Sequence, residues 1–333
     1  MKITLFGTQP YDRESFDRIR DAYGFDVTYH RSHLNAGNVA LAEGADVVCI
    51  FVNDTADAAT VARLSQLGVR LIALRCAGFN NVDLLSAAQH GIPVVRVPAY
   101  SPHAVAEHAV ALMLSLNRKI HRAYWRTRDG NFSLHGLLGF DLYGKTAGIV
   151  GTGRIARELI RILRGFGMEV IAYDLCPDEA YAVAAGIAYV PLDELYARAD
   201  IVSLHCPLTD RTRYMIGPEA IGRMKPGVML INTGRGQLIH TGALIDGLKQ
   251  KKIGAAGLDV YEEEAAYFYE DTSDRIMSDD VLARLLSFNN VIVTSHQGFF
   301  TREALDNIAR TTMENIREFA AGEPLTNRVS AGA

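Results

Sequence analysis

The sequence predicts an α/β protein in which two parallel-sheet units share one chain. Three observations lead to this class. The chain has 333 residues, which is more than one ordinary hydrophobic core accommodates, so two domains are expected. Short β-rich runs alternate with segments of helical periodicity, as in parallel sheets covered by helices. This alternation occurs twice, with a long helical segment between the two series.

Two series of predicted strands follow the chain. The first comprises residues 2–6, 47–52, 71–76 and 94–97. The second comprises residues 146–151, 169–174, 201–206, 228–233, 253–260 and 291–295. The runs are short and apolar, and the segments between them show helical patterns. Each series therefore predicts a Rossmann-like or flavodoxin-like parallel sheet.

A helix is expected between the two series, over residues 101–120. Ser101 can cap this helix and Pro102 suits its first turn. An apolar stripe then follows at helical spacing, formed by Val105, Ala109, Leu112, Met113 and Leu116. Small residues in the stripe permit close packing, so we interpret the segment as an interdomain or subunit helix.

The same segment contains a pattern that looks like a zinc-binding helix, formed by His103, Glu107 and His108. The two histidines are five positions apart, and this spacing places them well away from a shared helix face. We therefore predict no metal site.

Composition and charge argue against several classes of protein. The formal net charge is −4 and the charges are interspersed, which argues against nucleic acid or an anionic membrane as a partner. The longest apolar stretch is too short to span a bilayer, and the opening MKITLF lacks a signal-peptide core. The four cysteines are scattered and form neither a disulfide framework nor a zinc spacing. These features predict a cytoplasmic protein with reduced thiols.

Residues 145–174 are typical of a dinucleotide-binding strand, glycine turn, helix and strand. Gly151 can make the tight turn, and Gly153 lets the backbone approach a pyrophosphate. Ala156 stands where a third glycine often allows close packing of helix and strand. The glycine pattern alone is also compatible with an ordinary β-turn-α connection. Asp174, however, ends the second strand, where a carboxylate binds the adenosine ribose hydroxyls and repels a 2'-phosphate. The segment predicts a cofactor, with NAD favoured over NADP.

Three charged residues follow predicted strands of the second series: Arg235, Glu264 and His296. Taken singly, they have ordinary explanations as a solvated arginine, part of a solvated acidic run and a satisfied core histidine. Open α/β sheets bind ligands at the carboxyl ends of their strands, so the recurrence favours a shared site. A nicotinamide enzyme that reduces a keto acid needs a cation for the substrate carboxylate and a proton donor for the carbonyl oxygen. These three residues are the candidates for that chemistry.

Short motifs along nearly the whole chain resemble those of the D-isomer-specific 2-hydroxyacid dehydrogenases, and most closely the bacterial fermentative D-lactate dehydrogenases of that family. In chain order the motifs are CIFVND, ALRCAGFNNVD, VVRVPAYSP, YGKTAG, GTGRIA, SLHCPLT, INTGRG, DVYEEE and HQGF. The resemblance implies a reversible reduction of pyruvate to D-lactate by NADH.

The resemblance also implies roles for individual residues. Arg235 would bind the substrate carboxylate, Glu264 would be the acid partner and His296 would transfer the proton. The implied substrate-binding residues are Ala77, Gly78, Tyr100, Arg235 and Phe299. The implied cofactor-binding residues are Gly151, Gly153, Arg154, Ile155, Asp174, Cys206, Pro207, Thr233, Gly234, Arg235 and Asp259. Glycines on both sides of Arg235 would let the backbone bend tightly beside the guanidinium.

The family architecture implies a discontinuous division of the chain. A substrate domain would comprise residues 1–99 and 299–333, an NAD-binding domain would comprise residues 100–298, and the active-site cleft would lie between them. Members of the family are homodimers or dimers of dimers through the helical region at residues 103–114. Two departures from the family pattern are small: Ala156 replaces a glycine, and Gly298 stands where relatives often have alanine.

Two other functions are compatible with these motifs. A related D-2-hydroxyacid dehydrogenase would act on a bulkier 2-keto acid, but residues 267–286 resemble the lactate branch. An NAD-sensing corepressor-type protein would use the same fold to bind peptides. The lactate-type segments favour metabolism over this second alternative.

Overall fold

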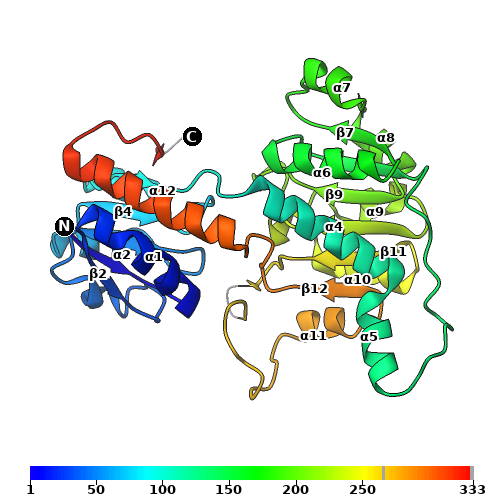
Figure 1. Cartoon of the computed structure of the whole chain (residues 1–333), viewed down its shortest axis with the longest axis horizontal. Helices are drawn as coiled ribbons and strands as arrows, with labels where there is room; N and C mark the ends of the chain where they lie inside the picture. Colours follow the sequence, from blue (N-terminus) through cyan, green and yellow to red (C-terminus); the bar gives the residue numbers. More distant parts are fainter. Residues whose placement is uncertain (265–266, 331–333) are drawn as a thin grey trace. The chain divides into compact units, whose positions relative to one another are not determined.

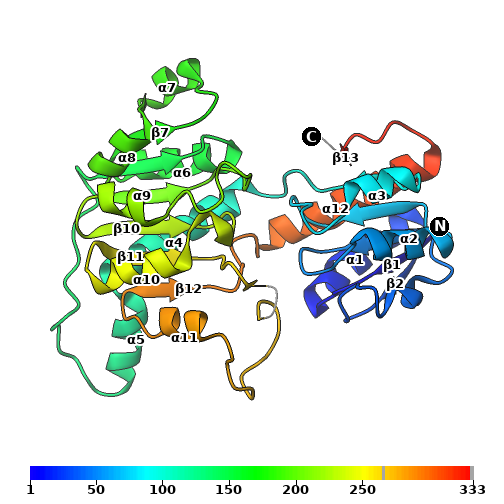
Figure 2. The same cartoon turned by 180° about the vertical axis from the view of Figure 1, so that it is seen from behind.

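The computed structural model describes residues 1–264 and 267–330, and the chain divides into two compact units. Unit 1 comprises Met1–Ser101 and Phe299–Ala333, and unit 2 comprises Pro102–Gly298. Residues 331–333, at the end of the predicted substrate domain, lie outside the described part. The first division falls after residue 101, so Tyr100 belongs to unit 1. Figures 1 and 2 show the chain from opposite sides.

The described part of unit 1 contains a six-stranded sheet in the order β13-β5-β4-β3-β1-β2. Its strands are β1 (Lys2–Leu5), β2 (Asp26–Tyr29), β3 (Val47–Ile50), β4 (Leu71–Leu74), β5 (Val94–Val95) and β13 (Arg328–Val329). All neighbouring pairs are parallel except β13 with β5. The central strands β3 and β4 are buried along their whole length, which explains their uninterrupted apolar sequences.

Helices cover both faces of this sheet. On one face, α1 (Pro10–Tyr23) and α12 (Arg302–Ala321) pack side by side, as Figure 1 shows. On the other face lie α2 (Ala58–Gln66), α3 (Leu84–Gln89) and the short 3-10 helix η1 (Val39–Ala42). The long α12 comes from the end of the chain, so unit 1 is assembled from two distant segments.

The described part of unit 2 contains a seven-stranded sheet in the order β12-β11-β10-β9-β6-β7-β8. Its strands are β6 (Thr146–Val150), β7 (Glu169–Tyr173), β8 (Ala188–Tyr189), β9 (Ile201–Leu204), β10 (Val228–Asn232), β11 (Ile253–Leu258) and β12 (Val291–Val293). All neighbouring pairs are parallel. The prediction of two parallel α/β sheets is therefore confirmed.

Two groups of helices sandwich the second sheet. In Figure 1, α4 (Pro102–Arg118) and α6 (Arg154–Gly165) lie in front of it. The opposite face, in front in Figure 2, carries α8 (Leu192–Arg198), α9 (Pro218–Arg223) and α10 (Thr241–Lys249). The remaining helices are α5 (Ile120–Arg128), α7 (Glu179–Ala185), α11 (Asp280–Leu286) and the 3-10 helix η2 (Gly236–Leu238).

The apolar stripe of α4 packs within unit 2. Ala109, Leu112, Met113 and Leu116 are buried in a cluster with residues of α6 and the sheet of unit 2. The stripe therefore belongs to the core of unit 2 itself, and the expectation that the segment is an interdomain or subunit helix stays a prediction. In the described residues no helix is both long and apolar enough to cross a membrane.

The predicted strands lie in the right places but run too far at their carboxyl ends. Residues 253–260 and 94–97, for example, contain the shorter β11 and β5. Three strands were not predicted, namely β2, β8 and β13. In unit 2, the extra residues assigned to the predicted strands are the first residues of the loops that carry the site residues described below.

Candidate active site

The parallel sheet of unit 2 gathers most of the predicted residues at one edge. The carboxyl ends of β6, β7, β9, β10, β11 and β12 lie along this edge because their pairings are all parallel. Gly151 follows β6, Asp174 follows β7, Cys206 and Pro207 follow β9, Thr233, Gly234 and Arg235 follow β10, Asp259 follows β11, and His296 follows β12. The topology therefore brings together residues that are distant in sequence.

The glycine turn after β6 has the shape that a dinucleotide requires. Gly151 has a φ of +89°, and a Cβ at this position would lie only 2.7 Å from the backbone nitrogen of Cys206. A Cβ at Gly153 would meet nothing within 4 Å, so open space lies beside this residue. Arg154 begins α6 and is exposed, while Ala156 is fully buried against the sheet. Close packing and an open approach to the amino end of α6 thus coexist in one turn.

Asp174 is anchored at the end of β7 by the same turn. Its Oδ2 accepts hydrogen bonds from the amide of Thr152 at 2.7 Å and from the Thr152 hydroxyl at 2.9 Å. Its Oδ1 accepts from the amide of Cys176 at 2.9 Å. Burial opposes ionisation, but the hydrogen bonds from Cys176 and Thr152 outweigh it and lower the pKa of Asp174. An ionised carboxylate therefore stands at the end of β7, at the residue predicted to bind the adenosine ribose.

Two further residues at this edge are compatible with a bound cofactor. Thr233 is buried, and its Oγ1 has no hydrogen-bond partner among the described residues. A buried hydroxyl of this kind is costly unless a ligand or water satisfies it. Burial raises the pKa of the Cys206 thiol to about 11, so this side chain is uncharged at neutral pH. Together with the glycine turn and Asp174, these residues fit a dinucleotide.

The loop after β10 holds Arg235 by backbone contacts. Asn232 accepts a hydrogen bond from the amide of Gly234 at 3.0 Å and donates one to the carbonyl of Arg235 at 2.9 Å. Arg235 Nη1 donates to the carbonyl of Gly234 at 2.8 Å. The half-buried guanidinium has no carboxylate partner within the described part of the chain, so it can receive an anionic ligand.

The glycines beside Arg235 differ in how closely other parts of the backbone approach them. Neither Gly234 nor Gly236 has a positive φ, so the tight turn that begins here, a 3-10 helix from Gly236 to Leu238, does not itself require glycine. A Cβ at Gly236 would lie 2.1 Å from the carbonyl carbon of Tyr261, whereas one at Gly234 would make only ordinary contacts from 3.5 Å. Gly236 is needed because the loop after β10 passes directly against the loop after β11.

Glu264 and His296 form a hydrogen-bonded pair. His296 Nδ1 lies 2.8 Å from Glu264 Oε1, and both side chains are largely buried. The other carboxylate oxygen of Glu264 accepts from the amide of Tyr261 at 3.0 Å, which fixes the glutamate. Tyr269 donates from its hydroxyl to the carbonyl of His296 at 3.0 Å. Since Nδ1 faces the carboxylate, Nε2 is the ring nitrogen that remains for a reacting group.

Asp259 faces the turn that carries His296. Its backbone carbonyl accepts from the amide of His296 at 2.7 Å. Its Oδ1 accepts from the Thr294 hydroxyl at 2.6 Å and from the amide of Gln297 at 2.8 Å, and its Oδ2 accepts from the amide of Gly298 at 2.8 Å. The carboxylate predicted to contact the cofactor is thus occupied in shaping the histidine turn.

The remaining predicted residues belong to unit 1. The amides of Ala77 and Gly78, after β4, donate no hydrogen bond within the described residues, so they can bind an anion. The buried ring of Phe299 meets the ring of Tyr100 edge-on at 6.1 Å and lies 5.8 Å from the ring of Phe51. These three rings form an aromatic cluster at the predicted substrate-binding residues.

Sequence reasoning missed several residues that shape the site. Thr152 anchors Asp174, and Asn232 shapes the Arg235 loop. Thr152 lies in the motif GTGRIA and Asn232 in the motif INTGRG, so the sequence drew attention to both positions. It did not indicate which atoms they would bind. Tyr269 and Thr294 had no such signal, because each acts through a contact with a distant part of the chain.

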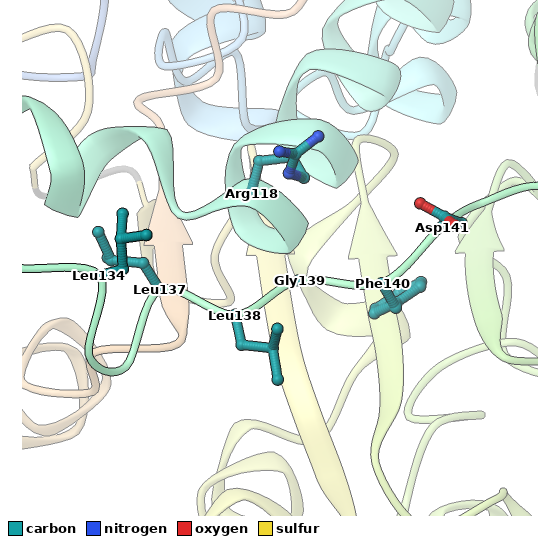
Figure 3. Close-up of a pocket in the computed structure, with 7 residues that line it drawn as sticks. All are labelled: Arg118, Leu134, Leu137, Leu138, Gly139, Phe140 and Asp141. Atoms are coloured by element: carbon teal, nitrogen blue, oxygen red, sulfur yellow. The ribbon is translucent and has the colours of Figure 1, made fainter.

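A pocket elsewhere in unit 2 does not belong to this site. Figure 3 shows it between Arg118, at the end of α4, and residues 134 and 137–141 of the segment after α5. None of the predicted catalytic, substrate-binding or cofactor-binding residues lines this pocket.

Comparisons with known proteins agree with this geometry. Residues 110–298 match the family model described as the D-isomer specific 2-hydroxyacid dehydrogenase, NAD binding domain. A 2-hydroxyacid dehydrogenase homologue of Haemophilus influenzae is 51% identical over 99% of both chains. The D-lactate dehydrogenase of Escherichia coli is 47% identical over 99% of this chain and 100% of its own. The solved structure of the pyruvate reductase of Chlamydomonas reinhardtii superposes with a TM-score of 0.93 at 47% identity, covering 98% of each chain.

The family model covers more than half of the chain, and the relatives are similar over nearly its full length. NAD is accordingly the cofactor that unit 2 binds. The chain belongs to the D-isomer-specific 2-hydroxyacid dehydrogenases and is an NAD-dependent enzyme of that family.

Proposed function

We propose that the protein is an NAD-dependent D-lactate dehydrogenase, which reversibly reduces pyruvate to D-lactate. The Glu264–His296 pair carries this proposal, because it places an imidazole held by a carboxylate at the same sheet edge as the dinucleotide-binding turn. The similarity to relatives named D-lactate dehydrogenase and pyruvate reductase supports pyruvate as the substrate.

NAD would be held by the turn after β6 and by the ends of the neighbouring strands. The residues assigned to it are Gly151, Gly153, Arg154, Ile155, Asp174, Cys206, Pro207, Thr233, Gly234, Arg235 and Asp259. Bound NADH supplies the hydride for reduction. The open space beside Gly153, the ionised Asp174 and the unsatisfied hydroxyl of Thr233 support this assignment. For Asp259 the support is indirect, since its carboxylate contacts the histidine turn.

His296 would donate the proton that completes reduction of the keto group. Its Nδ1 is bonded to Glu264, so the proton would leave from Nε2 to the substrate oxygen. In the imidazolium state Glu264 stabilises the charge, and in the oxidation direction the neutral ring takes the proton back. The two directions therefore use opposite protonation states of one residue.

The substrate carboxylate would be bound by Arg235 and by backbone amides of unit 1. The guanidinium of Arg235 can present two parallel N–H groups to a carboxylate. The amides of Ala77 and Gly78 would add two neutral donors. Tyr100 and Phe299 would enclose the methyl end of pyruvate, a role that their mutual ring contact supports. Unit 1, residues 1–99 with 299–333 and extended to Ser101, is then the substrate domain.

A kinetic panel tests this function. Pyruvate, 2-ketobutyrate, phenylpyruvate and glyoxylate are each supplied with NADH, and the loss of NADH absorbance is followed. The highest kcat/KM is expected for pyruvate, with D-lactate as the product. His296→Ala should abolish most turnover while NADH still binds. A preference for phenylpyruvate would identify a dehydrogenase for bulkier acids, and NADH binding without turnover of any acid would contradict the proposal.

We further propose a homodimer or a dimer of dimers in the cytoplasm. The four cysteines are all unpaired, which supports a reducing compartment. Since the apolar stripe of α4 is buried within unit 2, the interface would use α5 and the segment that follows it. Large exposed apolar side chains gather there, namely Ile120, Tyr124, Trp125, Phe132, Leu134, Leu138 and Tyr143. Cell fractionation and sedimentation test the two parts of this proposal.

A further inference from the structure

The turn that carries His296 adopts a conformation that needs external support. His296 has a φ of +53°, in the left-handed region that residues with a Cβ rarely adopt. The backbone of Asp259 binds the amide of His296, and its carboxylate binds the amides of Gln297 and Gly298. The position of His296 therefore depends on where one carboxylate is held.

That carboxylate is in turn connected to helix α4. The Nε2 atom of His108 lies 3.2 Å from Asp259 Oδ1 and 3.0 Å from Thr294 Oγ1. Thr294 Oγ1 itself donates to Asp259 Oδ1 at 2.6 Å. The side chain of His108 is 16% exposed and that of Asp259 only 2%, so this triangle of polar atoms is shielded from water.

The direction of each hydrogen bond in the triangle can be deduced. Burial raises the pKa of Asp259, but the hydrogen bonds from His108 and Thr294 outweigh burial and lower it overall, so the carboxylate is ionised and only accepts. Thr294 uses its single hydroxyl hydrogen on Asp259. The hydrogen between His108 and Thr294 must then come from Nε2 of His108. His108 is consequently a donor to this cluster.

Packing leaves the imidazole of His108 little freedom. A Cβ added to Gly298 would lie 2.8 Å from Asp259 Oδ2 and 3.4 Å from Cδ2 of His108. Ring, carboxylate and turn therefore pack against one another. His103, on the same helix, lies 3.2 Å from Glu158 and is largely exposed, so the two histidines of α4 have unrelated surroundings.

We propose that His108 is a positioning residue for the reaction, acting through Asp259 to hold the His296 turn in its left-handed conformation. This inference rests on the proposed role of His296 in proton transfer. His108 itself bonds only Asp259 and Thr294 within the described residues. Its effect is therefore on the placement of His296.

Three variants test the inference. His108→Leu keeps bulk but removes the donor, His108→Gln offers an N–H at a similar reach, and His103→Leu is the matched control on the same helix. We expect His108→Leu to lower kcat for pyruvate reduction about 10- to 100-fold, the usual effect of losing a hydrogen bond to a charged group. The dissociation constant of NADH, measured by fluorescence, should stay within twofold. His108→Gln should recover most of kcat, and His103→Leu should resemble the parent.

Hydrogen exchange provides a readout that does not depend on activity. In His108→Leu, a peptide covering residues 294–300 should exchange its amides faster than in the parent, because the amides of Gln297 and Gly298 lose a fixed acceptor. If the parent enzyme does not reduce pyruvate, the proposed function fails, and exchange alone decides the inference. Unchanged exchange in His108→Leu, an unchanged kcat in an active parent background, or equal losses in His103→Leu would each overturn it.

Discussion

At the scale of single residues, Asp174 is predicted to set the choice of cofactor. Its carboxylate is ionised and fixed by Thr152 and Cys176, so it would present a stationary negative charge to a bound ribose. Asp174→Ala should lower kcat/KM for NADH about 10- to 100-fold, as expected for the loss of charge-assisted hydrogen bonds, and should improve the relative use of NADPH. Steady-state kinetics with both cofactors measure the ratio.

Asp174→Asn is the matched control for this prediction. The amide keeps the shape and one acceptor but removes the charge, so discrimination against NADPH should relax while the turn stays in place. If the ratio of NADH to NADPH use is the same in the parent and both variants, Asp174 does not set the choice.

Arg235 should be equally sensitive to a conservative change. Lysine keeps the charge but lacks the planar fork that bonds a carboxylate twice. Arg235→Lys should therefore cost about 1.5 to 3 kcal/mol in kcat/KM for pyruvate, the usual contribution of one hydrogen bond to a charged group. The NADH dissociation constant should change little. Near-normal pyruvate kinetics together with weaker NADH binding would instead restrict Arg235 to its proposed contact with the cofactor.

The sequence predicted the positions of the site residues better than the contacts that hold them in place. Asp174, Arg235 and His296 stand directly after or near the carboxyl ends of strands, and parallel pairing brings these ends together, so their location followed from the order of motifs. The residues that hold these side chains in place could not be predicted, because their contacts join segments that are distant in sequence. His108 and Thr294 are 186 residues apart, and no local pattern marks them as neighbours.

At the scale of elements, one aspartate ties the strands of each sheet together at their amino ends. Asp200 accepts hydrogen bonds from the amide of Thr146 at 2.9 Å and from Lys225 Nζ at 3.0 Å. Asp46 plays the same part in unit 1, where it accepts from the amide of Lys2 at 2.9 Å and from Arg70 at 2.7 Å. Both residues precede a central buried strand, so their bonds connect three neighbouring strands.

This arrangement predicts a pH dependence of stability. Burial opposes ionisation of Asp200, but its bonds to Thr146 and Lys225 outweigh burial and lower the pKa below the usual 3.8. A carboxyl group with a lowered pKa stabilises the fold above its unfolded-state pKa and loses that effect as the pH falls through the folded-state pKa. Asp200→Asn should therefore reduce the free energy of unfolding by about 1 kcal/mol at pH 6. The difference from the parent should shrink below about pH 4.

Urea unfolding at several pH values measures this difference. Asp46→Asn should behave in the same way, since hydrogen bonds from Lys2 and Arg70 lower the pKa of Asp46. The side chain of Asp21 is almost fully exposed, so Asp21→Asn is the control and should leave stability unchanged at every pH. A difference between Asp200→Asn and the parent that persists undiminished at pH 3 would contradict the linkage.

The elements that were predicted and those that were missed differ in burial. β3, β4, β9 and β10 are buried throughout, so their apolar sequences identified them. β2 is half-exposed, while β8 and β13 are two-residue strands near the edges, too short to show a pattern. The carboxyl ends were predicted too long because loop residues such as Cys206 and Val260 continue the apolar character of the strand. The discontinuous division of the chain did not follow from strand order, since α12 joins unit 1 only through tertiary packing.

At the scale of the whole molecule, the surface of unit 2 suggests a partner. In the described structure α5 has no buried residue, and the segment after it exposes several large apolar side chains. Exposed apolar side chains favour association, because covering them with a second subunit removes them from water. Association between copies of the chain would thus stabilise α5, because no residue of this helix is buried within its own unit.

Two substitutions on this surface should separate the subunits. Trp125 is 65% exposed and Leu138 is 88% exposed, so charges at these positions should be tolerated by the folded chain but not by a dry interface. Burial of one such side chain contributes roughly 1.5 to 3 kcal/mol, and Trp125→Glu combined with Leu138→Asp should therefore raise the dimer dissociation constant by at least about a hundredfold. Sedimentation velocity over a range of concentrations measures that constant, and circular dichroism checks that the fold is retained.

Leu85, on α3 of unit 1, is 67% exposed, and Leu85→Asp serves as the control that should sediment like the parent. A parent chain that sediments as a monomer, or a double variant that stays assembled, would remove α5 and its following segment from the interface.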